Sequence, residues 1–312
     1  MPAEETVLSS VSERTEAVEF FQDDGYRIAG DVYGEPATAP GMIIFCHGWG
    51  GTKEIVAPVL AGEMVERTGC AALVFDYAGW GASAGPRGRI DPHYQARDVR
   101  SAVSYVAARY PQLASRIGLY GFSFGGSIST YVAAVDSRVS ALVSIAAFTD
   151  GARFLRDMRP RWEYLEFLAT VEQDRRQRAE TGKSAQVDPD TILRRDPTAR
   201  AFNEDLKRRF PERAFTIDLC SADRILDFEP VMFAPRLVGR PAMFIHCELD
   251  VIASPDNAVE LARVSDGDLR IIAGLGHYDI YAGPGLEQIS AAAADLFARM
   301  VAVTQPRPRA ES

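Results

Sequence analysis

The sequence of 312 residues has no long apolar run. None approaches the roughly 18 consecutive apolar residues that a membrane-spanning helix needs. Residues 1–16 are acidic and lack the basic stretch followed by an apolar stretch that typifies a signal peptide. The first absence excludes a transmembrane helix, and we expect a cytoplasmic protein with no membrane partner.

The sequence also has fewer basic than acidic residues, and it has only four cysteines. The chain has 34 Lys and Arg against 43 Asp and Glu, a net charge of −9, which gives no electrostatic reason to expect a nucleic-acid partner. The four cysteines have no C-x-x-C spacing, and Cys46 and Cys247 lie inside apolar runs. We therefore expect buried free thiols and a reducing compartment. The sequence leaves a homodimer open.

Short, continuously apolar runs are frequent, and they are typical of strands covered on both faces. They occupy residues 42–46, 71–77, 116–120, 141–146, 242–247 and 269–273. Helical segments separate most of them, at about residues 54–68, 92–110, 125–135, 255–264 and 286–303. Such alternation predicts an α/β fold with a doubly wound, mostly parallel sheet. Residues 17–21 and 27–32 flank Asp23-Asp24-Gly25 and predict a leading β-hairpin.

One connection is far longer than a strand-to-helix connection needs. Roughly 90 residues separate the runs at 141–146 and 242–247. Apolar residues recur there at helical spacing: Phe154, Leu155, Met158, Trp162, Leu165, Leu168 and Val171. Asp188-Pro189 and Ser221 are predicted helix starts.

We therefore expect a two-part organisation. Residues 17–149 and 236–304 form the core, and residues 150–235 form a helical cap over the site, with the apolar stripe packed against the mouth of the core. Residues 1–16 and 305–312 are expected to be flexible ends.

Gly121-Phe122-Ser123-Phe124-Gly125 is a G-x-S-x-G motif between a predicted strand and a predicted helix. A sharp turn at this point holds the serine in a strained conformation, so the residues two positions away must be small. The start of the following helix favours negative charge beside the serine. Ser123 is therefore the predicted nucleophile.

The chain has only four histidines, which narrows the choice of a catalytic base. His277 follows the last predicted strand through Gly274-Leu275-Gly276, on the edge of the sheet that the nucleophile uses. His246 lies inside a predicted strand and is expected to be a core histidine. His93 follows Asp91-Pro92 at a helix start and is expected at the surface. His277 is the predicted base.

Two predicted loops supply the acid partner and the oxyanion hole. Asp250 follows a predicted strand and is the predicted acid partner, with Glu248 as its rival on the same loop; Asp279 is too close to His277 in sequence to be favoured. His47-Gly48-Trp49-Gly50-Gly51 follows another strand, and its glycines let backbone N–H groups approach a substrate oxygen. We predict an oxyanion hole made by the N–H groups of Trp49 and Phe124, with His47 hydrogen-bonding the loop.

These motifs resemble the α/β-hydrolase superfamily, in particular its dienelactone-hydrolase-like and S15-peptidase-like serine hydrolases. The resemblance rests on HGWGG at 47–51, DYAGWGASAG at 76–85, GFSFGG at 121–126, ELD at 248–250 and GHYD at 276–279. It implies hydrolysis of an ester, thioester or amide of a small acyl substrate through an acyl-enzyme, with no metal or organic cofactor. It also implies that Asp76, Tyr77 and the loop to Gly85 line the rim of the site without catalysing, with Asp76 anchoring that loop.

The motifs do not identify the substrate. Trp162 and Leu165 of the insertion and Tyr77 are the candidate substrate-binding residues. An acyltransferase with the same three catalytic residues, and an inactive binding module on this fold, are the alternative functions. A dehalogenase or epoxide hydrolase would need a carboxylate where the chain has Ser123. A peptidase of the S15 kind would be longer and would need an anionic pocket for a substrate amine.

Overall fold

The protein is described here by a computed structural model, which describes residues 16–55, 57–210, 216–281 and 283–303. Most of both predicted flexible ends therefore lies outside the described residues. In the described part, eight strands form one sheet in the order β1-β2-β4-β3-β5-β6-β9-β10. Their bounds are β1 Glu16–Phe21, β2 Arg27–Tyr33, β3 Met42–Cys46, β4 Ala71–Phe75, β5 Ile117–Phe122, β6 Val139–Ile145, β9 Ala242–Cys247 and β10 Asp268–Ile272.

The pairing confirms the predicted mixture of one hairpin and a parallel sheet. β1 pairs antiparallel with β2, and β2 pairs antiparallel with β4. Every other neighbouring pair in the sheet is parallel. The carboxyl ends of these parallel strands lie along one edge, so the loops that follow β3, β5, β9 and β10 come together there.

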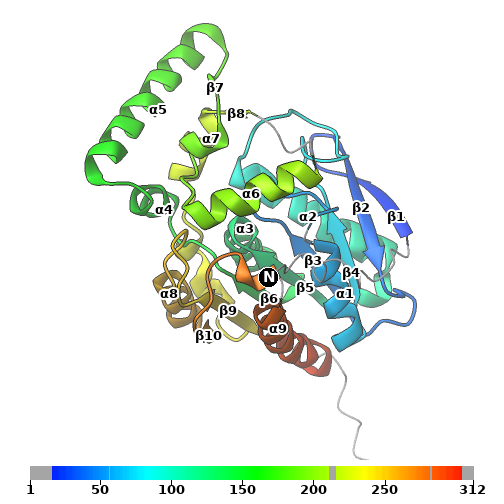
Figure 1. Ribbon diagram of the computed structural model, residues 1–312. Coiled ribbons are helices and arrows are strands. Elements are labelled where there is room, and N and C mark those ends of the chain that lie inside the picture. Colours follow the sequence, from blue (N-terminus) through cyan, green and yellow to red (C-terminus); the bar gives the residue numbers. More distant parts are fainter. Residues whose placement is uncertain (1–15, 56, 211–215, 282, 304–312) are drawn as a thin grey trace, which may run out of the picture.

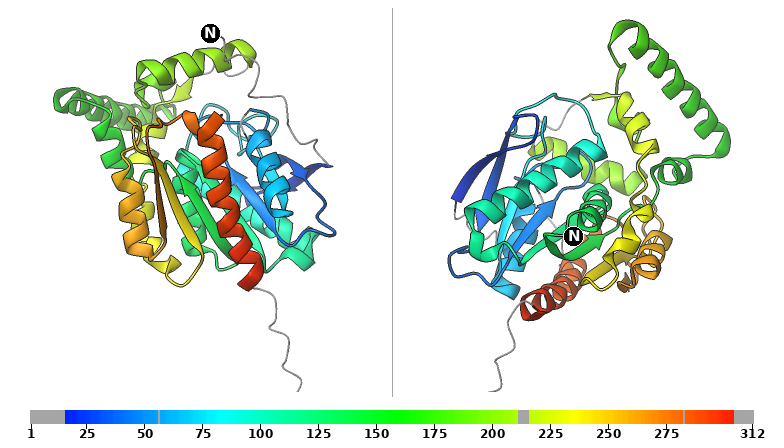
Figure 2. Two further views of the ribbon diagram at one scale, coloured as in Figure 1. Left: turned by 60° about the horizontal axis from the view of Figure 1, so that its bottom comes forward. Right: turned by 180° about the vertical axis from the view of Figure 1, so that it is seen from behind.

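Helices cover both faces of the sheet, which explains why its central strands are apolar throughout. One face carries α1 (Ala57–Thr68) and α9 (Gly283–Val303), and the other carries α2 (Pro92–Arg109), α3 (Phe124–Val135) and α8 (Asp256–Ser265) (Figures 1 and 2). Alternate side chains of β3 pack on opposite faces of the sheet. Its Ile44 packs into the core under α2 and α3, and its Ile43 and Phe45 pack under α1 and α9.

The insertion between β6 and β9 is mostly helical. It contains α4 (Gly151–Asp157), α5 (Arg161–Thr181), α6 (Pro197–Arg209), α7 (Cys220–Leu226) and a small ribbon of β7 (Gln186–Val187) with β8 (Ile217–Asp218). α6 lies across the carboxyl edge of the sheet, and α5 extends away from the body of the molecule (Figures 1 and 2). The same insertion therefore contains one helix over the site and one helix far from it.

The predicted packing of the apolar stripe is wrong for its middle part. Phe154 packs on the core, where its ring stacks on that of Phe148 with centroids 4.5 Å apart. Trp162 and Leu165, in contrast, are 63% and 53% exposed on α5. α5 is polar around most of its circumference. Near its C-terminal end, Arg178 pairs with Asp223 of α7. This part of α5 is therefore held against α7 and does not cover the carboxyl edge of the sheet.

Of the two predicted helix starts in the insertion, one is an N-cap and the other is not. Asp188 caps a short 3₁₀ turn, Pro189–Thr191. Ser221 is not an N-cap: it lies inside α7, and its hydroxyl accepts the N–H of Ile90. In the part of the chain that the structure describes, no helix is both long and apolar enough to span a bilayer.

Candidate active site

The backbone at Ser123 has a conformation that few residues other than glycine adopt. Its φ is 55° and its ψ is −125°, at the point where β5 ends and α3 begins. A Cβ on Gly121 would overlap the Ser129 side chain, and one on Gly125 would overlap the carbonyl oxygens of Cys46 and His47. The glycines of the motif therefore let the elbow pack directly against α3 and against the end of β3.

His277 lies between Ser123 and Asp250. Its Nε2 is 2.9 Å from Ser123 Oγ, and its Nδ1 is 2.6 Å from Asp250 Oδ2. A carboxylate only accepts hydrogen bonds, so Nδ1 carries the proton and Nε2 is left to accept the proton of the serine hydroxyl. This tautomer is the one in which an imidazole can act as a base toward Ser123.

The Asp250 carboxylate is buried but fully hydrogen-bonded. Oδ1 accepts the N–H groups of Ile252 (2.8 Å) and Ala253 (3.0 Å), while Oδ2 faces His277 and, at 3.2 Å, Nε2 of His246. Burial by itself would raise the pKa of Asp250. The charge of His277 and the hydrogen bonds from His246 and His277 outweigh it and hold the pKa well below its usual range. The carboxylate is thus kept ionised, as a partner for an imidazolium must be.

The rival carboxylates lie elsewhere on the same loops. Glu248 is exposed and accepts the N–H of Gly274 at 2.9 Å. Asp279 accepts the N–H of Gly276 at 2.8 Å. Glu248 thus joins the loop after β9 to the loop after β10, Asp279 closes its own loop, and the structure places neither on the imidazole of His277.

The other histidines have structural surroundings, as the sequence predicted. His47 donates from Nε2 to the carbonyl oxygen of Phe75, which joins the loop after β3 to the end of β4. His246 is buried on β9 and donates to the carbonyl oxygen of Ala253 at 2.9 Å. His93 is exposed at the start of α2. The contact of His246 with Asp250 was not predicted, because only the folded turn after β9 brings the two together.

The two predicted oxyanion donors stand on either side of the nucleophile. Phe124 is the first residue of α3, and the rings of Trp49 and Phe124 meet edge to face with centroids 5.7 Å apart. A Cβ on Gly48 would lie 3.3 Å from the Ser123 Cβ, so the glycine loop passes directly beside the serine. The structure gives neither amide N–H of Trp49 and Phe124 an acceptor among the described residues. Both can therefore donate to a substrate oxygen.

Asp76 anchors the loop that follows β4. It is buried, and it accepts the backbone N–H of Lys53 at 2.7 Å and that of Ala82 at 2.8 Å. The expectation that Tyr77 lines the rim is wrong. Its buried ring packs edge to face against His47 and Phe75, beneath the loop and outside the pocket.

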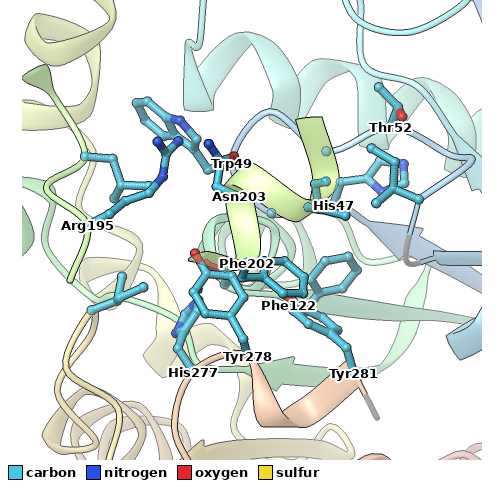
Figure 3. A pocket seen from close by; sticks show the side chains of 17 residues that line it. His47, Trp49, Thr52, Phe122, Arg195, Phe202, Asn203, His277, Tyr278 and Tyr281 are labelled. Atoms are coloured by element: carbon cyan, nitrogen blue, oxygen red, sulfur yellow. Dashed lines mark hydrogen bonds between the residues drawn. The ribbon is translucent and has the colours of Figure 1, made fainter. Parts of the chain in front are cut away.

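A pocket of about 640 Å³, counting its open mouth, contains Ser123 and His277 (Figure 3). Trp162 and Leu165 are not part of its lining, because α5 extends away from it. The insertion contributes other residues, which the sequence analysis missed: Leu193, Arg195, Phe202, Asn203 and Leu206, on α6 and the segment before it. The substrate-binding candidates on the insertion were therefore placed on the wrong helix.

Aromatic stacking attaches α6 to the catalytic loop. Phe202 of α6 stacks on Tyr278 with centroids 4.4 Å apart and lies 5.9 Å from Tyr281. Tyr278 in turn meets His277 edge to face at 5.1 Å. A signal for this helix exists in the sequence: Asp196-Pro197 is an N-cap followed by a first helical position, and Phe202 and Leu206 are one turn apart.

The structure shows no group of three or more metal-ligating His, Cys, Asp or Glu side chains among the residues it describes. The chemistry that the described groups offer is a serine hydroxyl, an imidazole, an ionised carboxylate and two backbone donors. Together these suit nucleophilic attack on an acyl carbon.

Asp250→Asn should lower turnover of an activated ester far more than Glu248→Gln, by about 10²-fold or more, because an amide at 250 favours the wrong tautomer of His277. Glu248→Gln is the matched control, since it makes the same acid-to-amide change on the same loop. Steady-state kinetics of the two variants measure the difference. The reverse ranking would make Glu248 the acid partner.

Comparison with known proteins places this chain in a family. A curated protein of Escherichia coli, an uncharacterized 31.7 kDa protein of the traX-finO intergenic region, is 31% identical over 253 residues, 80% of this chain and 87% of its own length. Polyketide transferase af380 of Aspergillus fumigatus is 27% identical over 290 residues, 88% of this chain and 94% of its own.

A solved structure is similar over nearly the whole chain. The crystal structure of the alpha/beta hydrolase GrgF from Penicillium superposes with a TM-score of 0.77 at 25% identity, covering 92% of this chain and 99% of the other. Residues 41–284 match the family described as alpha/beta hydrolase fold. The chain is therefore a member of the α/β-hydrolase fold family.

Proposed function

We propose that this chain is a serine hydrolase that cleaves a carboxylic ester or a related acyl bond, such as a thioester or an amide, through an acyl-enzyme. The observation that carries the proposal is the hydrogen-bonded series Asp250–His277–Ser123, in which the two ring nitrogens of His277 lie 2.6 Å from the carboxylate and 2.9 Å from the serine hydroxyl. The strained backbone at Ser123 supports the same role.

The proposed reaction has two halves. Ser123 Oγ attacks the acyl carbon while His277 Nε2 takes the hydroxyl proton, and the N–H groups of Trp49 and Phe124 hold the negative oxygen. His277 then gives the proton to the leaving group. Water then attacks the acyl-Ser123 ester while His277 takes one of its protons, and His277 returns that proton to Ser123 Oγ as the acid is released. Asp250 stabilises the imidazolium that forms in each half.

Ser123→Ala should reduce turnover of p-nitrophenyl esters by about 10³-fold or more, because it removes the nucleophile of both halves of the reaction. The measurement is kcat across a series of acyl lengths, with circular dichroism to show that the variant is folded. Near-normal turnover in a folded Ser123→Ala protein would overturn the proposal.

Acyl transfer is the second candidate, and a specific observation favours it: the relative that aligns over 94% of its length bears the name polyketide transferase. The same Ser123 acyl-enzyme would then be attacked by an alcohol or amine in place of water. The two functions share every step up to that point.

Adding excess alcohol to the ester assay separates the two functions. If the chain is a hydrolase, the free acid should remain the main product, because water is the normal acceptor. Mass spectrometry of the products measures the partition. A new ester that replaces the acid as the main product would identify a transferase.

A further inference from the structure

The end of the pocket that Trp49 and Arg195 line is rich in hydrogen-bond donors. The indole Nε1 of Trp49 is buried and has no hydrogen-bond partner among the described residues. Leaving such a donor unpaired costs about 1–3 kcal/mol, so an acceptor that reached it would be stabilised. An indole N–H can only donate, which restricts the missing group to an acceptor atom.

A guanidinium lies at the same end. The Arg195 side chain is only 7% exposed and lines the pocket. Its Nη1 donates to Asp190, and Arg200 approaches that carboxylate as well, with Nε 3.7 Å from Oδ2. Two guanidinium groups thus share one carboxylate, which leaves a local charge of +1. Arg195 has five N–H donors, and its bond to Asp190 uses only part of them.

Asn203 is the third polar side chain at this end of the pocket. It lies on α6, is 9% exposed and lines the pocket. Figure 3 shows the Trp49 indole, the Arg195 guanidinium and the Asn203 amide on one side of the pocket, opposite His277 and Tyr278. No Asp or Glu among the described residues lines the pocket to match these donors. The remaining lining is mainly apolar and aromatic.

We propose that Trp49 Nε1, Arg195 and Asn203 form a subsite for a carboxylate carried by the acyl chain of the substrate. The inference rests on the proposed function, because it places the reacting carbonyl at Ser123 and the carboxylate at the donor-rich end. A planar carboxylate accepts two donors from a guanidinium and still has lone pairs for an indole N–H. The apolar side chains between the two ends accommodate the methylene chain.

The substrates that test this subsite are p-nitrophenyl monoesters of linear dicarboxylic acids, from adipate to sebacate. Each is compared with the same ester whose far carboxylate is capped as a methyl ester. The wild-type protein should show a kcat/KM at least about tenfold higher for the carboxylate form at the chain length that spans the pocket. A wild-type protein that prefers the capped form at every length would overturn the subsite.

Arg195→Met removes the charge at similar length and should bring that selectivity ratio close to one. Arg194→Met is the matched control: Arg194 is the neighbouring residue, pairs with Glu163 and does not line the pocket, so the ratio should be unchanged. Trp49→Phe keeps the backbone N–H of residue 49 but lacks the indole donor, and should lower the ratio by a smaller factor. If Arg195→Met lowers kcat/KM equally for both esters, the selectivity ratio stays the same. That result would show that Arg195 only supports packing.

A binding measurement separates failure of the subsite from failure of the proposed function. Calorimetry on the Ser123→Ala protein compares the monomethyl ester with the dimethyl ester of every diacid from adipate to sebacate, without any turnover. Tighter binding of the monoanion that is lost in Ser123→Ala/Arg195→Met supports the subsite even if no ester is hydrolysed. Equal binding of both ligands overturns the subsite even if Ser123 proves to be the nucleophile.

Discussion

The backbone strain at Ser123 is the constraint on which the rest of the site depends. A φ of 55° at a residue with a side chain is unfavourable, and it persists only because the surroundings leave no alternative. β5 fixes the residue before the turn, and Ser123 N–H donates to Ile145 of β6 at 2.7 Å. Gly125 lets α3 begin against the end of β3. The result is a hydroxyl raised above the carboxyl edge of the sheet, with a helix start behind it.

The parallel sheet then brings the other groups to that hydroxyl. The loops after β3, β9 and β10 leave the same edge, so the N–H of Trp49, the carboxylate of Asp250 and the imidazole of His277 meet there despite lying far apart in the chain. A buried carboxylate would normally be neutralised. The donors around Asp250 keep it charged, and it orients His277 toward Ser123.

The insertion supplies a second part of the pocket lining. α6 lines the pocket and is attached through Phe202 to Tyr278, next to His277. The same segment brings Arg195 and Asn203 into a pocket that is otherwise mainly apolar. The predicted catalytic residues and this part of the pocket lining thus come from different parts of the chain, which meet at the aromatic contact.

The elements that could be predicted from the sequence are those that depend on residues close to one another in the chain. Continuous apolar runs and the motif around Ser123 predicted the strands, the elbow and the order of the site residues along one edge. The structure brings Ser123, His277 and Asp250 into hydrogen-bonding contact, and their catalytic roles remain predictions. The pocket lining was missed because it depends on how the insertion docks. Trp162 and Phe202 both belong to helical patterns with apolar positions, and only long-range packing decides which of them meets the core.

Labelling with a fluorophosphonate tests the central claim most directly, because such probes react with a serine only when it is activated. Peptide mass spectrometry of the labelled protein should show a single phosphonyl adduct on the peptide that contains Ser123, and His277→Ala should abolish it. A label on another residue, or equally fast labelling of Ser123 in the His277→Ala protein, would contradict the account.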